Sequence, residues 1–172
     1  MDTKLTGKTR IESDLIGARE IPAEALYGVQ TLRGIENFSI SKFRLSEYPL
    51  FIKGLAITKM AAAMANFELG LLTVEQKDAI IAACGEIIDG KHHDQFPVDM
   101  IQGGAGTTTN MNANEVIANR ALELMGHERG EYQYCSPNDH VNGSQSTNDA
   151  YPTAIHIGMY FKHLQLLPHL EE

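Results

Sequence analysis

Residues 102–121 read QGGAGTTTNMNANEVIANRA, and this stretch determines the architecture in the middle of the chain. Its glycines are followed directly by three threonines, the first of which is Thr107. Apolar residues then recur at helical spacing, and Gly126 comes after the last of them, so a helix is predicted over residues 110–125. Glycines let backbone amides approach a ligand closely, and the positive end of a helix attracts anions. The glycine-rich loop therefore predicts an anion-binding site.

The spacing of this loop argues against a nucleotide-binding site. No Lys-Ser or Lys-Thr pair follows at the distance that a nucleotide-binding loop requires, and the glycines do not have the GxGxxG pattern behind a clear strand. A flexible turn with a threonine cap is the alternative to an anion site.

A second stretch of small hydrogen-bond donors, SQSTND at residues 144–149, repeats this arrangement before the final helix. Asn148 or Asp149 is the expected N-cap, and Pro152 lies in the first helical turn. Two donor-rich helix starts in one chain suit the two carboxylates of a small diacid, whereas ordinary capping requires only one such residue in each place. Simple helix caps are the alternative interpretation.

The remaining pattern predicts a mainly α-helical fold. Residues 10–22 are expected to form one or two short strands or an extended arm, and a helix is expected from Ala23 to about Phe38. A stronger helix begins at Pro49, and its apolar residues keep helical spacing until Gly70 ends it. The segment Thr73-Val74-Glu75-Gln76 predicts a capping box for a helix that runs to Gly90.

The final helix, from Pro152 to the end of the chain, is apolar on more than one stripe. Such a surface implies partner helices that these residues do not supply.

Composition excludes several functional classes. The 172 residues carry 14 Lys+Arg and 22 Asp+Glu, a formal charge of −8, and no basic stripe, so nucleic acids and anionic membranes are not expected partners. No run approaches about 18 uninterrupted apolar residues, and Met1–Arg10 is polar, which argues against a spanning helix and a signal peptide. Cys84 and Cys135 are the only cysteines and lie far apart in the sequence. This pattern favours reduced thiols in a cytoplasmic protein over a disulfide framework.

Other polar residues give weaker indications. His92, His93 and Asp94 lack the spacing of a metal site, so a solvated loop is expected and no metal is predicted. Two interpretations of Arg33 are pairing with a carboxylate and an exposed helix residue, and the second is the expected one. His140, beside Asp139, is either pH-sensitive or a structural or exposed loop residue, and again the second is expected. No Ser-His-Asp or Cys-His arrangement is evident from spacing.

Residues 102–121 and the stretch SPNDHVNGSQSTNDAYPT at 136–153 resemble two signature regions of the aspartase/fumarase superfamily. The opening stretch RIESDLIGAREIPAEALYGVQTLRGIENF, the QGGAGT loop and STNDAYPTA resemble the aspartase branch in particular. The resemblance implies an N-terminal helical domain with a short β arm at residues 1–143, followed at 144–172 by the start of a central bundle of long helices. It covers about the first third of a family member.

The resemblance also implies a reaction, the reversible deamination of L-aspartate to fumarate and ammonia, with no cofactor. It implies that Thr107, Ser146, Thr147 and Asn148 contact the substrate. A secondary anion site at Ser136, Pro137, Asn138 and Asp139 is a weaker implication, and a simple turn is its alternative.

The catalytic serine of the family lies on a loop far downstream, so no catalytic residue is expected in this fragment, which should be inactive alone. Family members are homotetramers. Two further functions stay open, a class II fumarase-like hydratase and a non-catalytic helical domain that binds a dicarboxylate.

Overall fold

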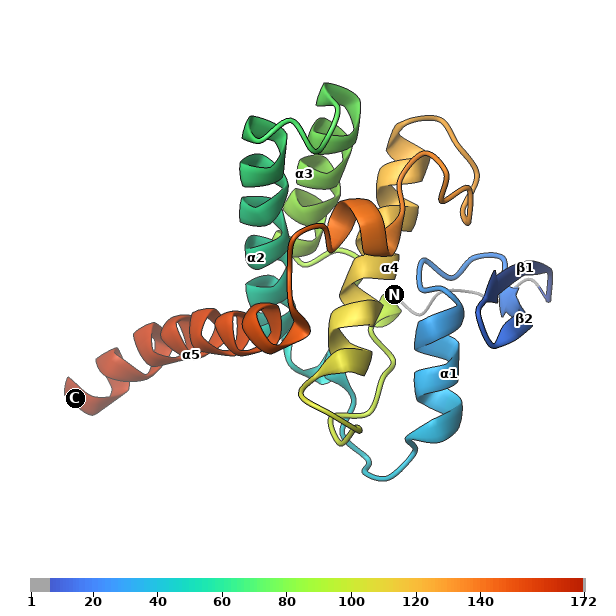
Figure 1. Ribbon diagram of the computed structural model, residues 1–172. Helices are drawn as coiled ribbons and strands as arrows, with labels where there is room; N and C mark the ends of the chain where they lie inside the picture. Colours follow the sequence, from blue (N-terminus) through green and yellow to red (C-terminus); the bar gives the residue numbers. More distant parts are fainter. Residues whose placement is uncertain (1–6, 172) are drawn as a thin grey trace.

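The computed structural model describes residues 7–171, and the polar stretch before residue 7 lies outside these described residues. Helices dominate, as predicted (Figure 1). In chain order the elements are β1 (Thr9–Asp14), β2 (Gly17–Pro22), α1 (Val29–Asn37), the 3-10 turn η1 (Leu45–Glu47), α2 (Pro49–Glu68), α3 (Val74–Ile88), the 3-10 turn η2 (His93–Gln95), α4 (Thr107–Leu124), the π-helical turn η3 (Pro137–Val141) and α5 (Thr147–Glu171). The expected short strands pair as an antiparallel hairpin.

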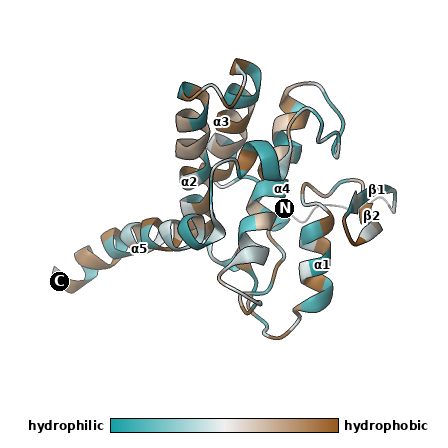
Figure 2. Ribbon diagram, viewed as in Figure 1, coloured by the Kyte–Doolittle hydropathy of each residue, from teal (hydrophilic) through white to brown (hydrophobic). Residues whose placement is uncertain are grey.

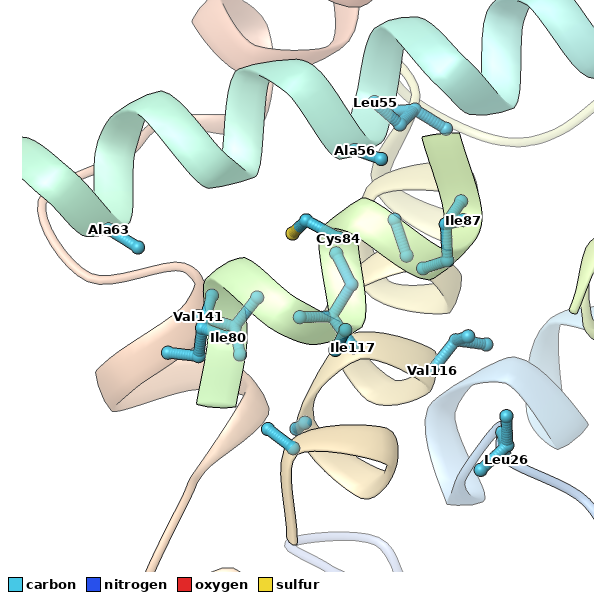
Figure 3. Close-up of a cluster of buried hydrophobic side chains, with 14 of the residues drawn as sticks. Leu26, Leu55, Ala56, Ala63, Ile80, Cys84, Ile87, Val116, Ile117 and Val141 are labelled. Atoms are coloured by element: carbon cyan, nitrogen blue, oxygen red, sulfur yellow. The ribbon is translucent and has the colours of Figure 1, made fainter. Parts of the chain in front are cut away.

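The main core lies between α2, α3 and α4 (Figure 3). Ile80 and Cys84 of α3 point into it together with Ile117 of α4, and all three side chains are fully buried. Burying an aliphatic side chain of this size contributes about 1.5–3 kcal/mol, so this cluster stabilises the three-helix arrangement that carries the loops.

Several predicted helix ends are confirmed. Thr73 and Gln76 form the predicted capping box, in which each side chain accepts from the other residue's backbone amide. Gly70, Gly90 and Gly126 follow their helices with φ of 74°, 90° and 83°, the left-handed conformation that terminates a helix and that glycine adopts at low cost.

Helix α1 begins at Val29, six residues later than predicted. The guanidinium of Arg10 donates to the backbone carbonyls of Pro22, Ala25 and Tyr27, at 3.0, 2.7 and 2.8 Å. These carbonyls are therefore engaged by a strand residue, and the segment before Val29 is held in a non-helical conformation.

Helix α5 crosses α2 closely and then extends away from the rest of the chain (Figure 1). A Cβ atom on Gly54 of α2 would overlap the carbonyl oxygen of Ala154, and one on Gly158 would lie 3.0 Å from the carbonyl oxygen of Leu50. Apolar residues continue along the extending part (Figure 2). Large exposed side chains there are Met159, Tyr160, Leu164, Leu166, Leu167 and Leu170. The division expected after residue 143 stays a prediction.

Among the described helices, α2 alone has the length and composition to cross a membrane. It packs against α3 and α5, and its Lys59 is fully buried in the protein. Both features are typical of a core helix.

Candidate functional site

The two donor loops lie next to each other because Asn110 of α4 joins them. Its side-chain Nδ2 donates to Thr147 Oγ1 at 3.0 Å and to Asn142 Oδ1 at 3.0 Å. Asn110 is three residues after Thr107, so it lies one helical turn from the glycine-rich loop. Thr107 and Thr147 are the first residues of α4 and α5, and the starts of these two helices meet at this point.

A second contact brings the glycine-rich loop against α5. Gly106 has φ of 92°, and a Cβ atom there would overlap the ring of Tyr151. Tyr151 lies one turn after Thr147, so its ring packs against the last loop residue before Thr107. Only glycine satisfies both the left-handed backbone and the close ring contact.

The start of α4 has no capping side chain of its own, since Gly106 is the N-cap. The alternative interpretation of a threonine cap is therefore wrong, and the helix begins at Thr107 rather than at the predicted Asn110. Gln102 Oε1 accepts from the amide of Thr109 at 3.0 Å. Thr107 itself is exposed. This helix start is positive and accessible, as an anion site requires.

Ser146, and not Asn148 or Asp149 as predicted, caps α5. Its Oγ accepts from the amide of Asn148 at 3.1 Å, and its carbonyl oxygen accepts from the amides of Asp149 and Ala150. Ser146 and Asn148 are exposed and Thr147 is half-buried. The capping interpretation is thus correct for Ser146, although its hydroxyl keeps a proton to donate.

A buried polar layer beneath the loops was missed by sequence reasoning. Lys59 of α2 has an exposed fraction of 0 %, and its Nζ donates to Asn142 Oδ1 at 2.9 Å and to Gln145 Oε1 at 3.0 Å. Burial lowers the pKa of Lys59 to about 7. A signal was present, because Lys59 lies seven residues after Ile52 and four before Ala63, on the buried stripe of α2.

The segment predicted as a secondary anion site forms a capped turn. The Ser136 hydroxyl donates to Asp139 Oδ2 at 2.9 Å and accepts from the Asp139 amide at 3.1 Å. Ser136 and Pro137 are buried, whereas Asn138 and Asp139 are exposed. These contacts are those of the simple turn given as the alternative, and anion binding here stays a prediction.

Arg33 is not the exposed residue that was expected, and the alternative interpretation, pairing with a carboxylate, is confirmed. Its guanidinium binds both carboxylate oxygens of Asp14 at 2.8 Å, which holds the pKa of Asp14 down to about 2. Arg33 and Asp14 line a cavity of about 230 Å³ together with Thr107 and Thr108. Two charged residues that the sequence did not assign to the site therefore lie beside its first loop.

His92 makes a hydrogen bond to a residue of helix α3 and is part of a group of charged side chains. His92 Nε2 lies 2.9 Å from Glu86 Oε2, and Glu86 also pairs with Arg120 at 2.6 Å. Within residues 7–171, no three His, Cys, Asp or Glu side chains gather as they would around a metal ion.

Known proteins resemble this chain over nearly all its length. The family described as Lyase matches residues 17–172. Aspartate ammonia-lyase of Helicobacter pylori (strain J99) is 64 % identical over 88 % of the chain and 32 % of that protein. Aspartate ammonia-lyase of Escherichia coli (strain K12) is 57 % identical over 95 % of the chain and 34 % of that protein. The chain thus spans about a third of the length of these relatives.

Solved structures agree in fold. A fumarate lyase:delta crystallin from Brucella melitensis superimposes with a TM-score of 0.94 at 52 % identity, over 95 % of this chain and 36 % of the other. A class II fumarase from Schistosoma mansoni gives a TM-score of 0.82 at 39 % identity, over 88 % and 32 %. The expected aspartase/fumarase-type fold is confirmed, and with a family match that begins at residue 17 and extends through residue 172, the chain belongs to the lyase family.

Proposed function

We propose that this chain is the N-terminal part of an aspartate ammonia-lyase and supplies its carboxylate-binding loops. The observation that carries the proposal is the hydrogen bond from Asn110 to Thr147, which places the starts of α4 and α5 side by side. Support also comes from relatives named aspartate ammonia-lyase at 57–64 % identity.

The proposed reaction is the reversible elimination of ammonia from L-aspartate to give fumarate. The proton to be removed is weakly acidic and is bound to the carbon next to a carboxylate. Its removal adds further negative charge to that carboxylate in the enediolate-like intermediate. Preorganised donors stabilise that charge, and each is typically worth a factor of about 100–1000 in rate. We assign this role to the hydroxyls of Thr107, Ser146 and Thr147 and to the amide of Asn148.

Residues 7–171 supply the donors in this proposal, and we place the general base in a downstream segment, as the family resemblance implies. The chain alone is therefore expected to be inactive, and the complete protein is expected to assemble as a homotetramer. Cys84 and Cys135 are free and buried, which supports a cytoplasmic protein.

The test is the absorbance of fumarate formed from L-aspartate, measured on the chain alone and on the chain joined to its downstream segment. Activity is expected only in the joined protein, and Thr107→Ala or Ser146→Ala should lower kcat about a hundredfold. Ser39→Ala, at an exposed loop position, is the matched control and should leave kcat unchanged. Turnover by the 172 residues alone would contradict the assignment of the base to another segment.

A hydratase is the second candidate, because a class II fumarase shares the fold at 39 % identity. Consumption of malate instead of aspartate by the joined protein would establish it. Saturable binding of succinate without turnover of either substrate would establish a non-catalytic dicarboxylate-binding domain.

A further inference from the structure

The amino group of Lys59 is enclosed within the protein beneath the two loops, and the residue is 0 % exposed. Its hydrogen-bond partners, Asn142 and Gln145, are neutral amides. No carboxylate in residues 7–171 lies within ion-pair distance of it. Buried charges in proteins are normally paired, because removing an ion from water is costly. This charge therefore has no compensating anion in the described residues.

A continuous set of hydrogen bonds leads from Lys59 to the loop donors. Asn142 Oδ1 accepts from Lys59 at 2.9 Å, from Asn110 at 3.0 Å and from Asn114 at 3.2 Å. The same Nδ2 of Asn110 donates to Thr147 Oγ1 at 3.0 Å. Taken end to end, these contacts place the Lys59 ammonium within about 9 Å of the Thr147 hydroxyl. Because that hydroxyl oxygen already accepts from Asn110, its own proton points elsewhere and is available to an anion.

We propose that Lys59 is a positioning residue, which orients Thr147 through Asn142 and Asn110 and whose buried positive charge is compensated by the dicarboxylate bound at the two loops. This inference rests on the proposed function and deepens it, since it names a buried cation as the source of the site's preference for a doubly charged ligand. At about 9–11 Å and the screening usual in proteins, such a charge favours the ligand carboxylate that binds nearest to Thr147 on the order of tenfold.

The surroundings of Lys59 make this coupling depend on pH. Burial lowers its pKa to about 7, so in the free site it is about half charged at pH 7. The Cys84 thiol of α3 faces it, and burial raises the pKa of that thiol to about 12, so it is neutral. Its hydrogen-bond partners, Asn142 and Gln145, come from the loop before α5, and the α4 side chains that share Asn142 with it, Asn110 and Asn114, are also neutral amides. His140 of η3 is bound to Ser136 and Gln76, and Asp149 and His156 of α5 are exposed.

A bound dicarboxylate stabilises the charged form of Lys59, and a tenfold preference equals about one pKa unit. Binding near pH 7.5 should therefore be accompanied by uptake of about half a proton per site. Affinity should weaken about tenfold as the pH rises from about 6.5 to about 9, because the ammonium is lost over this range.

The test is calorimetric titration of the complete lyase that contains this chain with succinate, in buffers of different ionisation enthalpy at about pH 7.5, with Kd also measured from about pH 6.5 to 9. Lys59→Met should fold with an unchanged or higher Tm, bind succinate about tenfold more weakly at about pH 6.5 and take up no proton. Lys53→Met, on the same helix, makes the same change in net charge and should behave as the unsubstituted protein. Asn110→Ala should weaken binding but keep the proton uptake.

Succinate affinity and proton uptake in Lys59→Met that equal those of the unsubstituted protein would overturn the inference. So would an absence of proton uptake in the unsubstituted protein, as expected if a downstream carboxylate pairs with Lys59. That second result decides the matter even if Lys59→Met does not fold. A protein that neither binds succinate nor forms fumarate would instead refute the proposed function, so the two failures are distinguishable.

Discussion

Glu115 illustrates how one side chain fixes the relative position of two helices. It lies on α4 with 2 % exposure, and its carboxylate accepts from the backbone amides of Gly28, Gln30 and Thr31 at 2.8, 2.8 and 3.0 Å. Those amides belong to the start of α1, where Gly28 supplies no capping side chain. Glu115 therefore caps α1 from another helix, and its negative charge lies at the positive end of the α1 dipole.

Glu115→Gln should lower the free energy of unfolding by about 3 kcal/mol, because the amide removes a charge-assisted acceptor and directs N–H groups toward backbone N–H groups. Urea denaturation at constant m-value measures this. Glu36→Gln, at an exposed position of α1, is the control and should change stability by less than about 0.5 kcal/mol. Equal losses of free energy of unfolding in the two variants would show that the buried contacts of Glu115 do not stabilise the protein.

Single residues also mark the limit of sequence reasoning about the site. The two loops that contain Thr107, Ser146 and Thr147 were predicted as candidate anion sites because donors at helix starts are a local pattern, whereas the roles of the individual residues came from the family resemblance. Lys59 and Asn142 were missed, since their importance depends on a contact between residues 83 positions apart. A polar residue on an apolar stripe is visible in the sequence, but its partner is not.

At the level of elements, regular features were predictable and irregular ones were not. The capping box at Thr73 and the glycines after α2, α3 and α4 gave correct helix boundaries because they act over three or four residues. The predicted start of α1 was wrong because Arg10, which belongs to β1, binds backbone carbonyls of the segment that precedes the helix. The π-helical turn η3 was not predicted, since a simple turn was given there only as the alternative to an anion site.

The junction between the glycine-rich loop and α5 gives a prediction for Gly106. Gly106→Ala should destabilise the protein more than Gly126→Ala, because both residues have left-handed backbones but only Gly106 faces a ring. The expected losses are about 1 kcal/mol at Gly126 and more than about 3 kcal/mol at Gly106. Thermal unfolding of both variants measures the difference, and equal losses would mean that Tyr151 moves aside freely.

At the scale of the whole molecule, α5 leaves the helical core with much of its apolar surface uncovered. Leu166 and Leu170 are 50 % and 69 % exposed. An apolar groove of about 690 Å³ lies where α5 leaves α2, and its lining includes Tyr48, Phe51 and Met159. The sequence predicted this apolar helix correctly, whereas its direction depends on the close crossing at Gly54 and Gly158.

The chain by itself is expected to self-associate through this uncovered face, since contiguous exposed apolar surface favours association. Sedimentation velocity over a range of concentrations should show species larger than the 19.0 kDa monomer. Leu166→Lys with Leu170→Lys should shift the distribution toward monomer. Leu69→Lys, at an exposed residue after α2, is the control. A monomer at all concentrations would contradict the expectation.

The contact between Gly106 and Tyr151 also limits how such a sequence can diverge over time. Replacement of Gly106 requires a smaller side chain at position 151 and a change in the backbone conformation at position 106. Each of these changes is unfavourable without the other. The two positions are therefore expected to change together or not at all, so drift in the two loops is linked even though Gly106 and Tyr151 lie far apart along the chain.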